Sequence, residues 1–131
     1  RVTQRPDVIV FEGWCLGVPP EAADALPTPV NALERDEDPD GRWRRHVNTA
    51  LALYAPLWCR IDRLLFLQGP GFEVVPAWRA EAEATPAGAL PAIDIARFVL
   101  FFERISRQAL ATLPQVADHV IHLDAARQPR D

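Results

Sequence analysis

The sequence predicts an α/β fold built on a small parallel sheet. Apolar runs at residues 8–11 and 64–67, and a third short run within residues 117–124, alternate with stretches of helical periodicity. Apolar runs without polar alternation are typical of strands that are covered on both faces, as in parallel sheets. Strands that alternate with helices indicate parallel pairing through helical crossovers.

The first predicted strand lies in the segment DVIVFEGWCLG, residues 7–17. Its four apolar residues, Val8–Phe11, are followed by Glu12 and Gly13. Ligands of open α/β sheets bind outside the carboxyl ends of the strands, so Glu12 is a candidate functional carboxylate. Few residues precede this strand, and three strands would form a small, poorly covered sheet. We therefore expect the chain to be part of a larger domain.

Residues 18–41 are predicted to form a loop, because they contain five prolines and the acidic run ERDEDPDG. A helix is expected to follow, with Asp40 as its N-terminal cap and Pro56 as the residue that bends or ends it. Its apolar residues recur at three- and four-residue steps and predict one buried stripe: Trp43, Val47, Ala50, Leu51, Tyr54, Leu57 and Trp58.

The second half of the chain contains the other two predicted strands and the strongest helix. The run at 64–67 ends at Gly69-Pro70-Gly71, and a short helix is expected from about Ala77, after a break at Pro76. Residues 85–91 have the composition of a loop. The strongest helical pattern spans residues 92–113 and ends at Pro114.

Composition excludes several classes of protein. The chain has 131 residues, enough for one domain, and its net charge of −4 argues against a general nucleic-acid binder. No apolar run approaches the roughly 20 residues of a membrane span. Cys15 and Cys59 lie far apart, which favours two reduced thiols in a cytoplasmic protein, with a disulfide as the alternative. All fourteen basic residues are arginines.

Five blocks of sequence resemble a known enzyme family in their order and spacing: DVIVFEGWCLG, PVNALERDEDPDGRWRRHVN, LQGPGFEVVPAWRAEAE, FERISRQAL and ADHVIHLDAAR. They are similar to the plant- and bacterial-type D-glycerate 3-kinases, which belong to the P-loop kinase group that includes phosphoribulokinase and uridine kinase. The similarity covers about residues 7–127. It implies a doubly wound P-loop fold that transfers the γ-phosphoryl group of ATP to D-glycerate with Mg²⁺.

The resemblance also implies that residues 1–131 are the C-terminal part of a single P-loop kinase domain. In such kinases the phosphate-binding loop lies upstream of the EGW strand, and this sequence contains neither a G-x-x-x-x-G-K-[ST] motif nor any lysine. We therefore expect a partial doubly wound sheet without the P-loop segment, and no activity of the chain alone. The resemblance implies that residues 18–41 form the acceptor-side loop and that the long helix, 92–113, lies near the lid. It assigns no specific adenine contact.

Glu12 resembles the second acidic position of P-loop kinases, which orients the Mg²⁺ shell or activates the acceptor hydroxyl. Phosphoryl transfer depends on positioning and charge neutralisation, so one well-placed carboxylate fits this chemistry. The alternative is an acid at a strand end that accepts a hydrogen bond from a neighbouring backbone amide.

Arg44, Arg45 and Asn48 are candidate substrate-binding residues. Arg44 and Asn48 are four residues apart and share a helix face, with Arg45 beside them. Glycerate carries a carboxylate, which matches the planar fork of a guanidinium group. The alternative is that these arginines neutralise the acidic run just upstream.

Arg104 and Arg107 lie in the block that resembles the family's arginine-bearing segment near the bound phosphates. The resemblance implies that they stabilise the transferring phosphoryl group, the role of an arginine finger. The alternative is structural, because Glu103 and Arg107 have the i, i+4 spacing of a surface ion pair.

Two other functions stay open at this point. The arginines would equally suit a kinase for another small hydroxylated substrate, pantothenate-like or sugar-like. A non-catalytic interaction fragment is the other alternative, since a sheet without its neighbouring strands exposes an edge that invites pairing. The expected partners are ATP and a small hydroxy acid, without nucleic acid or membrane, and the sequence does not indicate an oligomeric state.

Overall fold

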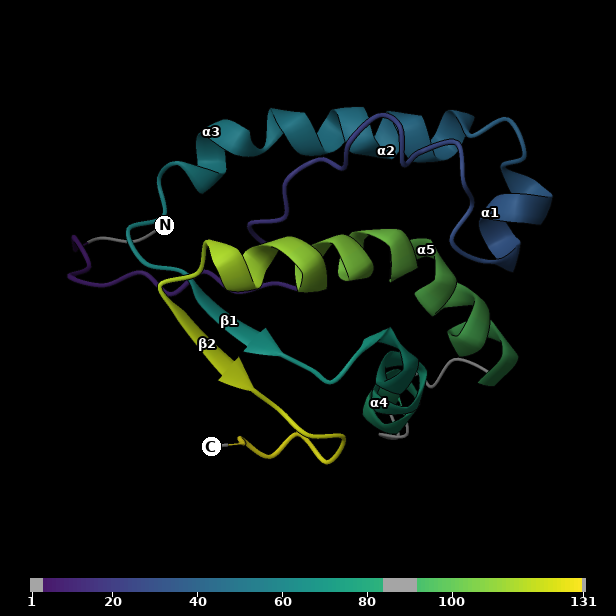
Figure 1. The fold of residues 1–131 in the computed structure, drawn as a ribbon. Helices are drawn as coiled ribbons and strands as arrows, with labels where there is room; N and C mark the ends of the chain where they lie inside the picture. Colours follow the sequence, from purple (N-terminus) through teal and green to yellow (C-terminus); the bar gives the residue numbers. More distant parts are fainter. Residues whose placement is uncertain (1–3, 84–91, 131) are drawn as a thin grey trace.

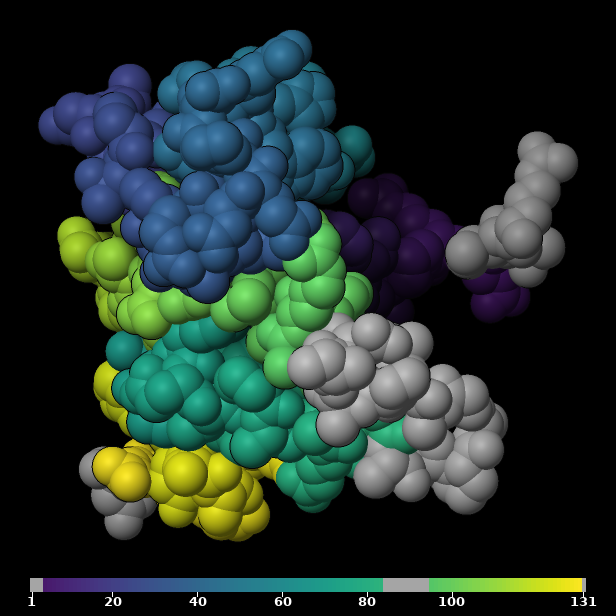
Figure 2. Space-filling model, turned by 90° about the vertical axis from the view of Figure 1, so that its right-hand side faces the viewer, coloured from purple at the N-terminus to yellow at the C-terminus, as the bar shows by residue number. Residues whose placement is uncertain are grey.

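The long helix α5 (Ala92–Thr112) lies between a two-stranded sheet and a layer formed by α2 (Arg42–Leu53) and α3 (Ala55–Trp58) (Figure 1, Figure 2). This arrangement is that of a computed structural model, which describes residues 4–83 and 92–130, with the backbone alone at 92–94. The remaining elements are α1 (Ala32–Glu37), a 3₁₀ turn at Phe72–Val74, α4 (Val75–Glu83) and a 3₁₀ turn at Leu113–Gln115.

The two strands β1 (Leu65–Gln68) and β2 (His119–His122) pair in parallel, in a register that sets Leu65 opposite His119. His119 N donates to Leu64 O at 3.2 Å, and Leu123 N donates to Gln68 O at 2.8 Å. The chain crosses from one strand to the other through α4 and α5. A mixed α/β fold with a small parallel sheet is therefore confirmed; β2 falls within the third predicted run, and β1 overlaps the run at 64–67 but ends one residue later, at Gln68.

The strand predicted at Val8–Phe11 is wrong. The segment has no regular secondary structure, and within the part of the chain that the structure describes no backbone group pairs with it. Its side chains are exposed, with fractions of 77% for Val8 and 85% for Val10. A β-strand exists only through hydrogen bonds to a neighbour, and an apolar run supplies the side chains for a strand without supplying that neighbour.

The helix expected after residue 41 is confirmed, and it ends at Leu53 before a short second helix that carries Pro56 in its first turn. The proline has no N–H to donate, which is tolerated at the start of a helix. The expected burial of the apolar stripe is wrong, because none of its seven residues is buried: Trp43, Tyr54 and Leu57 are exposed and the other four are half-buried. Trp43 is 55% exposed and Tyr54 is 50% exposed.

The N-cap position of α2 is Gly41 and not the expected Asp40, and the carboxylate that caps the first-turn N–H groups is that of Asp38. Asp38 Oδ1 accepts a hydrogen bond from Trp43 N at 2.9 Å, and Oδ2 accepts one from Arg44 N at 3.1 Å. The chain reaches this geometry because Gly41 adopts a left-handed conformation with φ of 65°. A Cβ at Gly41 would lie 2.9 Å from the Arg44 guanidinium, so this position favours glycine for two reasons.

The predicted loop at 18–41 contains one helix, α1, which the sequence analysis missed. Asn31 is its N-cap and accepts a hydrogen bond from Glu34 N at 2.9 Å, while Glu34 Oε2 accepts one from Val30 N at 3.0 Å. This reciprocal pattern is a close variant of the capping box, and N-x-x-E was its visible signal.

The predictions for the second half of the chain are correct for the long helix and wrong at Pro76. Helix α4 begins at Val75, so Pro76 lies inside its first turn and does not precede the helix. Helix α5 ends at Thr112, and Pro114 lies in the 3₁₀ turn that follows. The loop predicted at 85–91 lies outside the described residues.

The apolar core is small and follows one face of α5. Its buried side chains are Val18, Leu26, Leu33, Phe72, Ile95, Val99 and Leu113. Cys15 and Cys59 are both free thiols, as expected, and burial raises the pKa of the Cys15 thiol to about 11. Among the described residues, no helix combines the length and apolar character needed to cross a membrane.

Replacement of the α2 cap tests this account of the fold. We expect Asp38→Ala to lower the free energy of unfolding by about 2 kcal/mol, because it removes the acceptor for two helix N–H groups and a partner of Arg44. Asp40→Ala is the matched control and should change stability by less than about 0.5 kcal/mol, because Asp40 is exposed and contributes only its backbone carbonyl. Urea denaturation measures both values, and equal losses would contradict the assignment.

Candidate functional site

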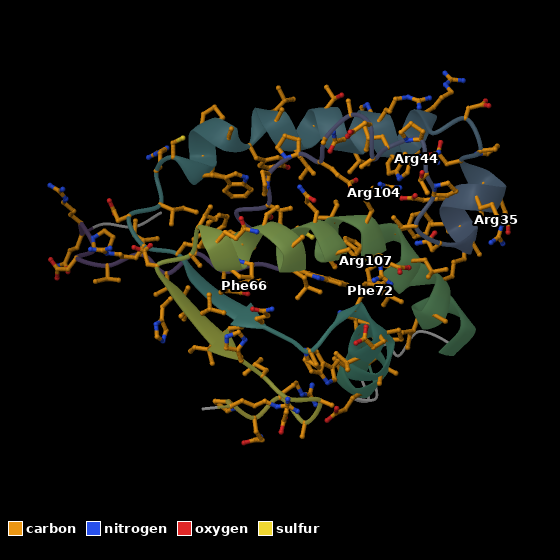
Figure 3. All side chains as sticks on the ribbon, viewed as in Figure 1. Arg35, Arg44, Phe66, Phe72, Arg104 and Arg107 are labelled. Atoms are coloured by element: carbon orange, nitrogen blue, oxygen red, sulfur yellow. The ribbon has the colours of Figure 1, made fainter. Side chains whose placement is uncertain are left out.

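The densest polar cluster centres on Arg104, which projects from α5 toward α1 and the loop before it (Figure 3). Its guanidinium forms a two-pronged ion pair with Glu34, at 2.8 Å from Nε and 2.7 Å from Nη2. Nη1 donates to Glu21 Oε2 at 2.6 Å, and Nη2 also donates to Thr28 O at 2.5 Å. Arg104 is only 9% exposed, so its donors are taken up by the protein.

The charges of this cluster are matched. Burial pushes the pKa of Glu34 upward, but the hydrogen bonds from Arg104 and Val30 outweigh that effect and the pKa lies below its ordinary value. The hydrogen bond with Glu34 raises the pKa of Arg104. Both groups are therefore charged at neutral pH, and the pair ties α5 to the start of α1.

A second arm of the cluster runs through Asn31 and Glu103. Asn31 Nδ2 donates to Leu100 O at 2.9 Å and to Glu103 Oε2 at 3.1 Å. Glu103 Oε1 in turn accepts from Arg107 Nε at 2.9 Å and from Arg107 Nη2 at 2.7 Å. The Arg107 guanidinium lies 5.8 Å from the centre of the Phe72 ring, and its side chain is 54% exposed. The i, i+4 pair that was the structural alternative for Arg107 is thus present.

Arg44 is more deeply buried than Arg104, at 3% exposure. It donates to Leu26 O at 2.5 Å, to Pro27 O at 3.1 Å, and to Asp38 O and Oδ2 at 2.6 and 3.2 Å. A substrate carboxylate would have to displace these contacts, so the geometry favours the neutralising role that was the alternative for Arg44.

Asn48 and Arg45 also bind the chain itself. Asn48 Oδ1 accepts from Glu21 N at 2.7 Å, and Asn48 Nδ2 donates to Glu21 O at 3.0 Å. The side-chain amide thus binds both backbone groups of Glu21, as the backbone of a neighbouring strand would. Arg45 is exposed and donates to Asp40 O. The substrate-binding roles of these three residues stay predictions, while their observed contacts are structural.

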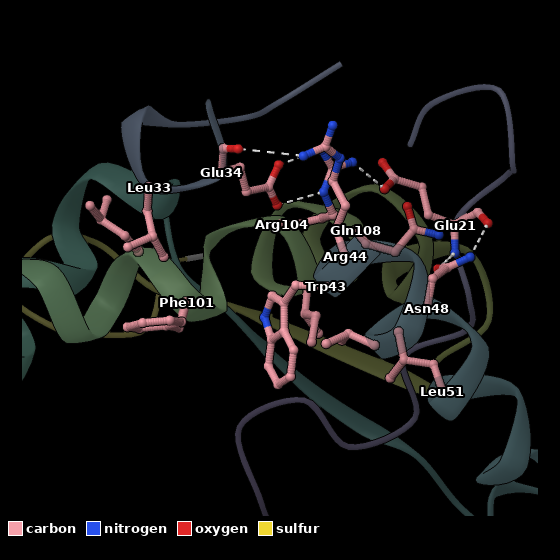
Figure 4. A pocket seen from close by; sticks show the side chains of 13 residues that line it. Glu21, Leu33, Glu34, Trp43, Arg44, Asn48, Leu51, Phe101, Arg104 and Gln108 are labelled. Atoms are coloured by element: carbon pink, nitrogen blue, oxygen red, sulfur yellow. Dashed lines mark hydrogen bonds and ion pairs between the residues drawn. The ribbon is translucent and has the colours of Figure 1, made fainter. Parts of the chain in front are cut away.

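A narrow cavity lies between α2 and α5, beside this cluster (Figure 4). Its lining includes the ion pair of Arg104 and Glu34 and the apolar side chains of Val47, Leu51 and Ile105. The cavity volume of about 30 Å³ has room for one or two water molecules and not for a hydroxy acid. The cluster therefore has a structural role in this conformation: Arg104, Glu34 and Glu21, called the clasp below, hold α5 against α1 and the loop before it.

Glu12 is not brought to the cluster. It lies in the exposed N-terminal segment and, within the described residues, forms no hydrogen bond or ion pair. Of the predicted site residues, Arg44, Asn48 and Arg104 line one cavity, whereas Arg107 lies beside Phe72 on the sheet side of α5 (Figure 3). No local sequence pattern indicated the acidic partners Glu21 and Glu34, which come from the segment predicted to be a loop.

The carboxyl end of the sheet contains one polar group that sequence reasoning also missed. Gln68 is the last residue of β1, and its Oε1 is buried without a hydrogen-bond donor among the described residues. The indole of Trp78 packs against the next residue, where a Cβ at Gly69 would lie 3.1 Å from the ring, and Trp78 Nε1 donates to Ala125 O at 2.8 Å. This edge is where ligands bind in open α/β sheets.

Comparison with known proteins found no match to a family model, a curated protein or a solved structure. Nor do the described residues contain a group of three or more histidine, cysteine, aspartate or glutamate side chains that could hold a metal ion.

The clasp can be tested by its energetics. We expect Arg104→Met to lower the free energy of unfolding by about 3 kcal/mol, because the change leaves two partly buried carboxylates without their cation. Arg107→Met is the matched control on the same helix and should cost less than about 1 kcal/mol, since its ion pair is half exposed. Urea denaturation of both variants decides the point, and a larger loss for Arg107→Met would contradict it.

The pH dependence of stability should report on Glu34. Its pKa in the folded chain lies below the ordinary value of 4.5, so its ion pair stabilises the fold above that value and is lost as the pH falls through the folded pKa. The stability difference between the wild type and Glu34→Gln should thus be constant from about pH 8 to 6 and shrink below about pH 4.5. A difference that grows on acidification would refute the assigned charge state.

Proposed function

We propose that this chain supplies the acceptor side of an ATP-dependent small-molecule kinase whose substrate is D-glycerate or a similar hydroxy acid. The observation that carries the proposal is the order of the five sequence blocks that resemble D-glycerate 3-kinases. Supporting it, the third block begins within β1 and the fifth block contains β2, and these two strands form a parallel pair with a helical crossover between them. Parallel pairs of this kind are the unit from which P-loop kinases are built.

The observed contacts divide the arginines into two groups under this proposal. Arg104 and Arg44 act as positioning residues, because their donors hold the loop of residues 18–41 in place. Arg107 is half exposed and Arg45 is exposed, so these two side chains have the access that a phosphoryl group or a substrate carboxylate requires. Glu12 is assigned to the acceptor hydroxyl or to the Mg²⁺ shell. In the Mg²⁺ shell, a single carboxylate would act together with the phosphate oxygens of the nucleotide.

The residues of this chain do not by themselves fit the phosphates of ATP. The sequence contains no lysine and no glycine-rich P-loop motif. The proposal therefore gives this chain the acceptor side only, and it places the binding of ATP and Mg²⁺ on a P-loop encoded in frame upstream of Arg1.

A second candidate function, a non-catalytic interaction module, is favoured by a different observation. Val8–Phe11 and the outer face of β1 are apolar and exposed, and such surfaces mark interaction sites. The reading frame before the Arg1 codon separates the two candidates: a glycine-rich loop with Lys-Ser or Lys-Thr supports the kinase, and a start codon supports the module.

A phosphorylation assay tests the kinase proposal. The 131-residue chain alone should not phosphorylate D-glycerate with ATP, whereas the protein with its upstream coding sequence should do so and should prefer D-glycerate to pantothenate and to sugars. In that longer protein, Glu12→Gln should lower kcat by about 100-fold or more with little change in KM, because its contribution is made in the transition state. Turnover by the chain alone, or equal effects on kcat and KM, would contradict the proposal.

A further inference from the structure

The second half of α2 and all of α3 are attached to the rest of the molecule with little apolar burial. Of the described residues in these two helices, only Arg44 is buried, and it lies in the first turn of α2. Residues 52–57 are exposed without interruption, with fractions of 79% for Leu53 and 38% for Leu57. Isolated helices of this length are marginal in water, so this layer depends on what it packs against.

The polar attachments of this layer lie at its two ends. At one end Asn48 binds both backbone groups of Glu21. At the other end, after α3, Asp118 Oδ2 accepts a hydrogen bond from Leu64 N at 2.8 Å. Between these ends lie residues 49–62, called the strap below. Among the described residues, the hydrogen bonds of the strap run only within α2, α3 and the turn that follows them.

The side of the strap that faces the molecule is poorly filled. The structure describes the whole strap, and its half-buried side chains are Ala50, Leu51, Trp58 and Ile61, with none fully buried. Leu51 lines the narrow cavity between α2 and α5. Trp58 Nε1 is buried and has no hydrogen-bond acceptor among the described residues. A buried donor without an acceptor loses the hydrogen bond that water would give it, so the closed position of the strap contains two defects.

Release of the strap would remove both defects at a small cost. Water would reach the indole N–H of Trp58, and the apolar contacts given up would be those of half-buried side chains only. Helix α5 does not depend on the strap, because the buried core holds its other face, where Val99 is 1% exposed. Low burial and few polar contacts are the features of segments that open locally while the rest of a protein stays folded.

We propose that the strap is a gate. Residues 49–62 detach from α5 in a local opening that leaves the rest of the fold intact and joins the cavity beside the clasp to solvent. The attachments at Asn48 and Asp118 confine the motion to the segment between them. The gate controls access to a cavity whose lining includes the polar side chains of Arg104 and Gln108. This inference concerns a motion of the chain and is independent of any kinase activity.

Hydrogen exchange measured by NMR on the 131-residue chain tests the proposal. The backbone amides of residues 53–59 and the indole N–H of Trp58 should be protected about 100-fold less, or weaker still, than the amides of Val99 and Arg104. Exchange in the strap should depend only weakly on urea below the unfolding transition, because a local opening exposes little surface. Exchange in α5 should instead follow the global unfolding curve.

Three variants sharpen this test. Leu51→Ala removes a contact that the opening breaks, so it should accelerate exchange in residues 53–59 by about tenfold. Leu53→Ala is the matched control, because Leu53 is 79% exposed, and it should change that exchange by less than about threefold. Val99→Ala removes a contact that the opening keeps. It should therefore accelerate exchange in α5 and leave exchange in the strap unchanged.

Two results would overturn the proposal. The first is protection of residues 53–59 that equals that of the α5 amides and falls with urea as steeply, since the strap would then open only in global unfolding. The second is a Val99→Ala variant in which exchange accelerates equally in the strap and in α5. If Val99→Ala does not fold, the urea dependence and the pair of leucine variants still decide the question.

Discussion

The guanidinium of Arg104 is the group on which the packing of the N-terminal half depends. The segment 18–41 contains five prolines and, apart from α1, little regular hydrogen bonding, so side chains have to fix its path. Arg104 and Arg44 bind the carbonyl oxygens of three successive residues, Leu26, Pro27 and Thr28. Arg104 in return forms ion pairs with two carboxylates, those of Glu21 and Glu34. Burial of these charges is tolerable because almost every donor has an acceptor, which is the condition for a stable buried ion pair.

This network shows where sequence reasoning succeeded and where it had no information. The helices at α2 and α5 and the strands β1 and β2 follow from periodicity and from prolines, which act over a few residues. The partners of Arg104 lie 70 and 83 residues away in the chain, and no local pattern reports such a distance. The cap Asp38 was missed for the same kind of reason, since it reaches α2 through a left-handed turn at Gly41 that composition does not specify.

The arginines illustrate how one residue type supports two interpretations. A guanidinium that suits a substrate carboxylate also suits the carboxylate of Glu34 or the carbonyl of Leu26, and spacing along a helix does not distinguish between them. Burial distinguishes them: Arg44 and Arg104 are at most 9% exposed, whereas half of the Arg107 side chain is accessible. The N-x-x-E pattern at Asn31 and Glu34 was the one local signal that could have assigned part of the clasp from the sequence.

The exposed N-terminal segment sets a physical condition on any catalytic role of Glu12. Glu12 follows Val8–Phe11, and a carboxylate can act in catalysis only if its backbone is held within a fraction of an ångström of the productive position. Nothing in the described residues bonds to the backbone of Val8–Phe11, so that precision is not available to Glu12 in this conformation. The edge of β1 that faces away from β2 also has no neighbouring strand among the described residues, and the exposed side chains there are apolar. A catalytic role for Glu12 therefore requires a neighbour that holds the backbone of its segment in place.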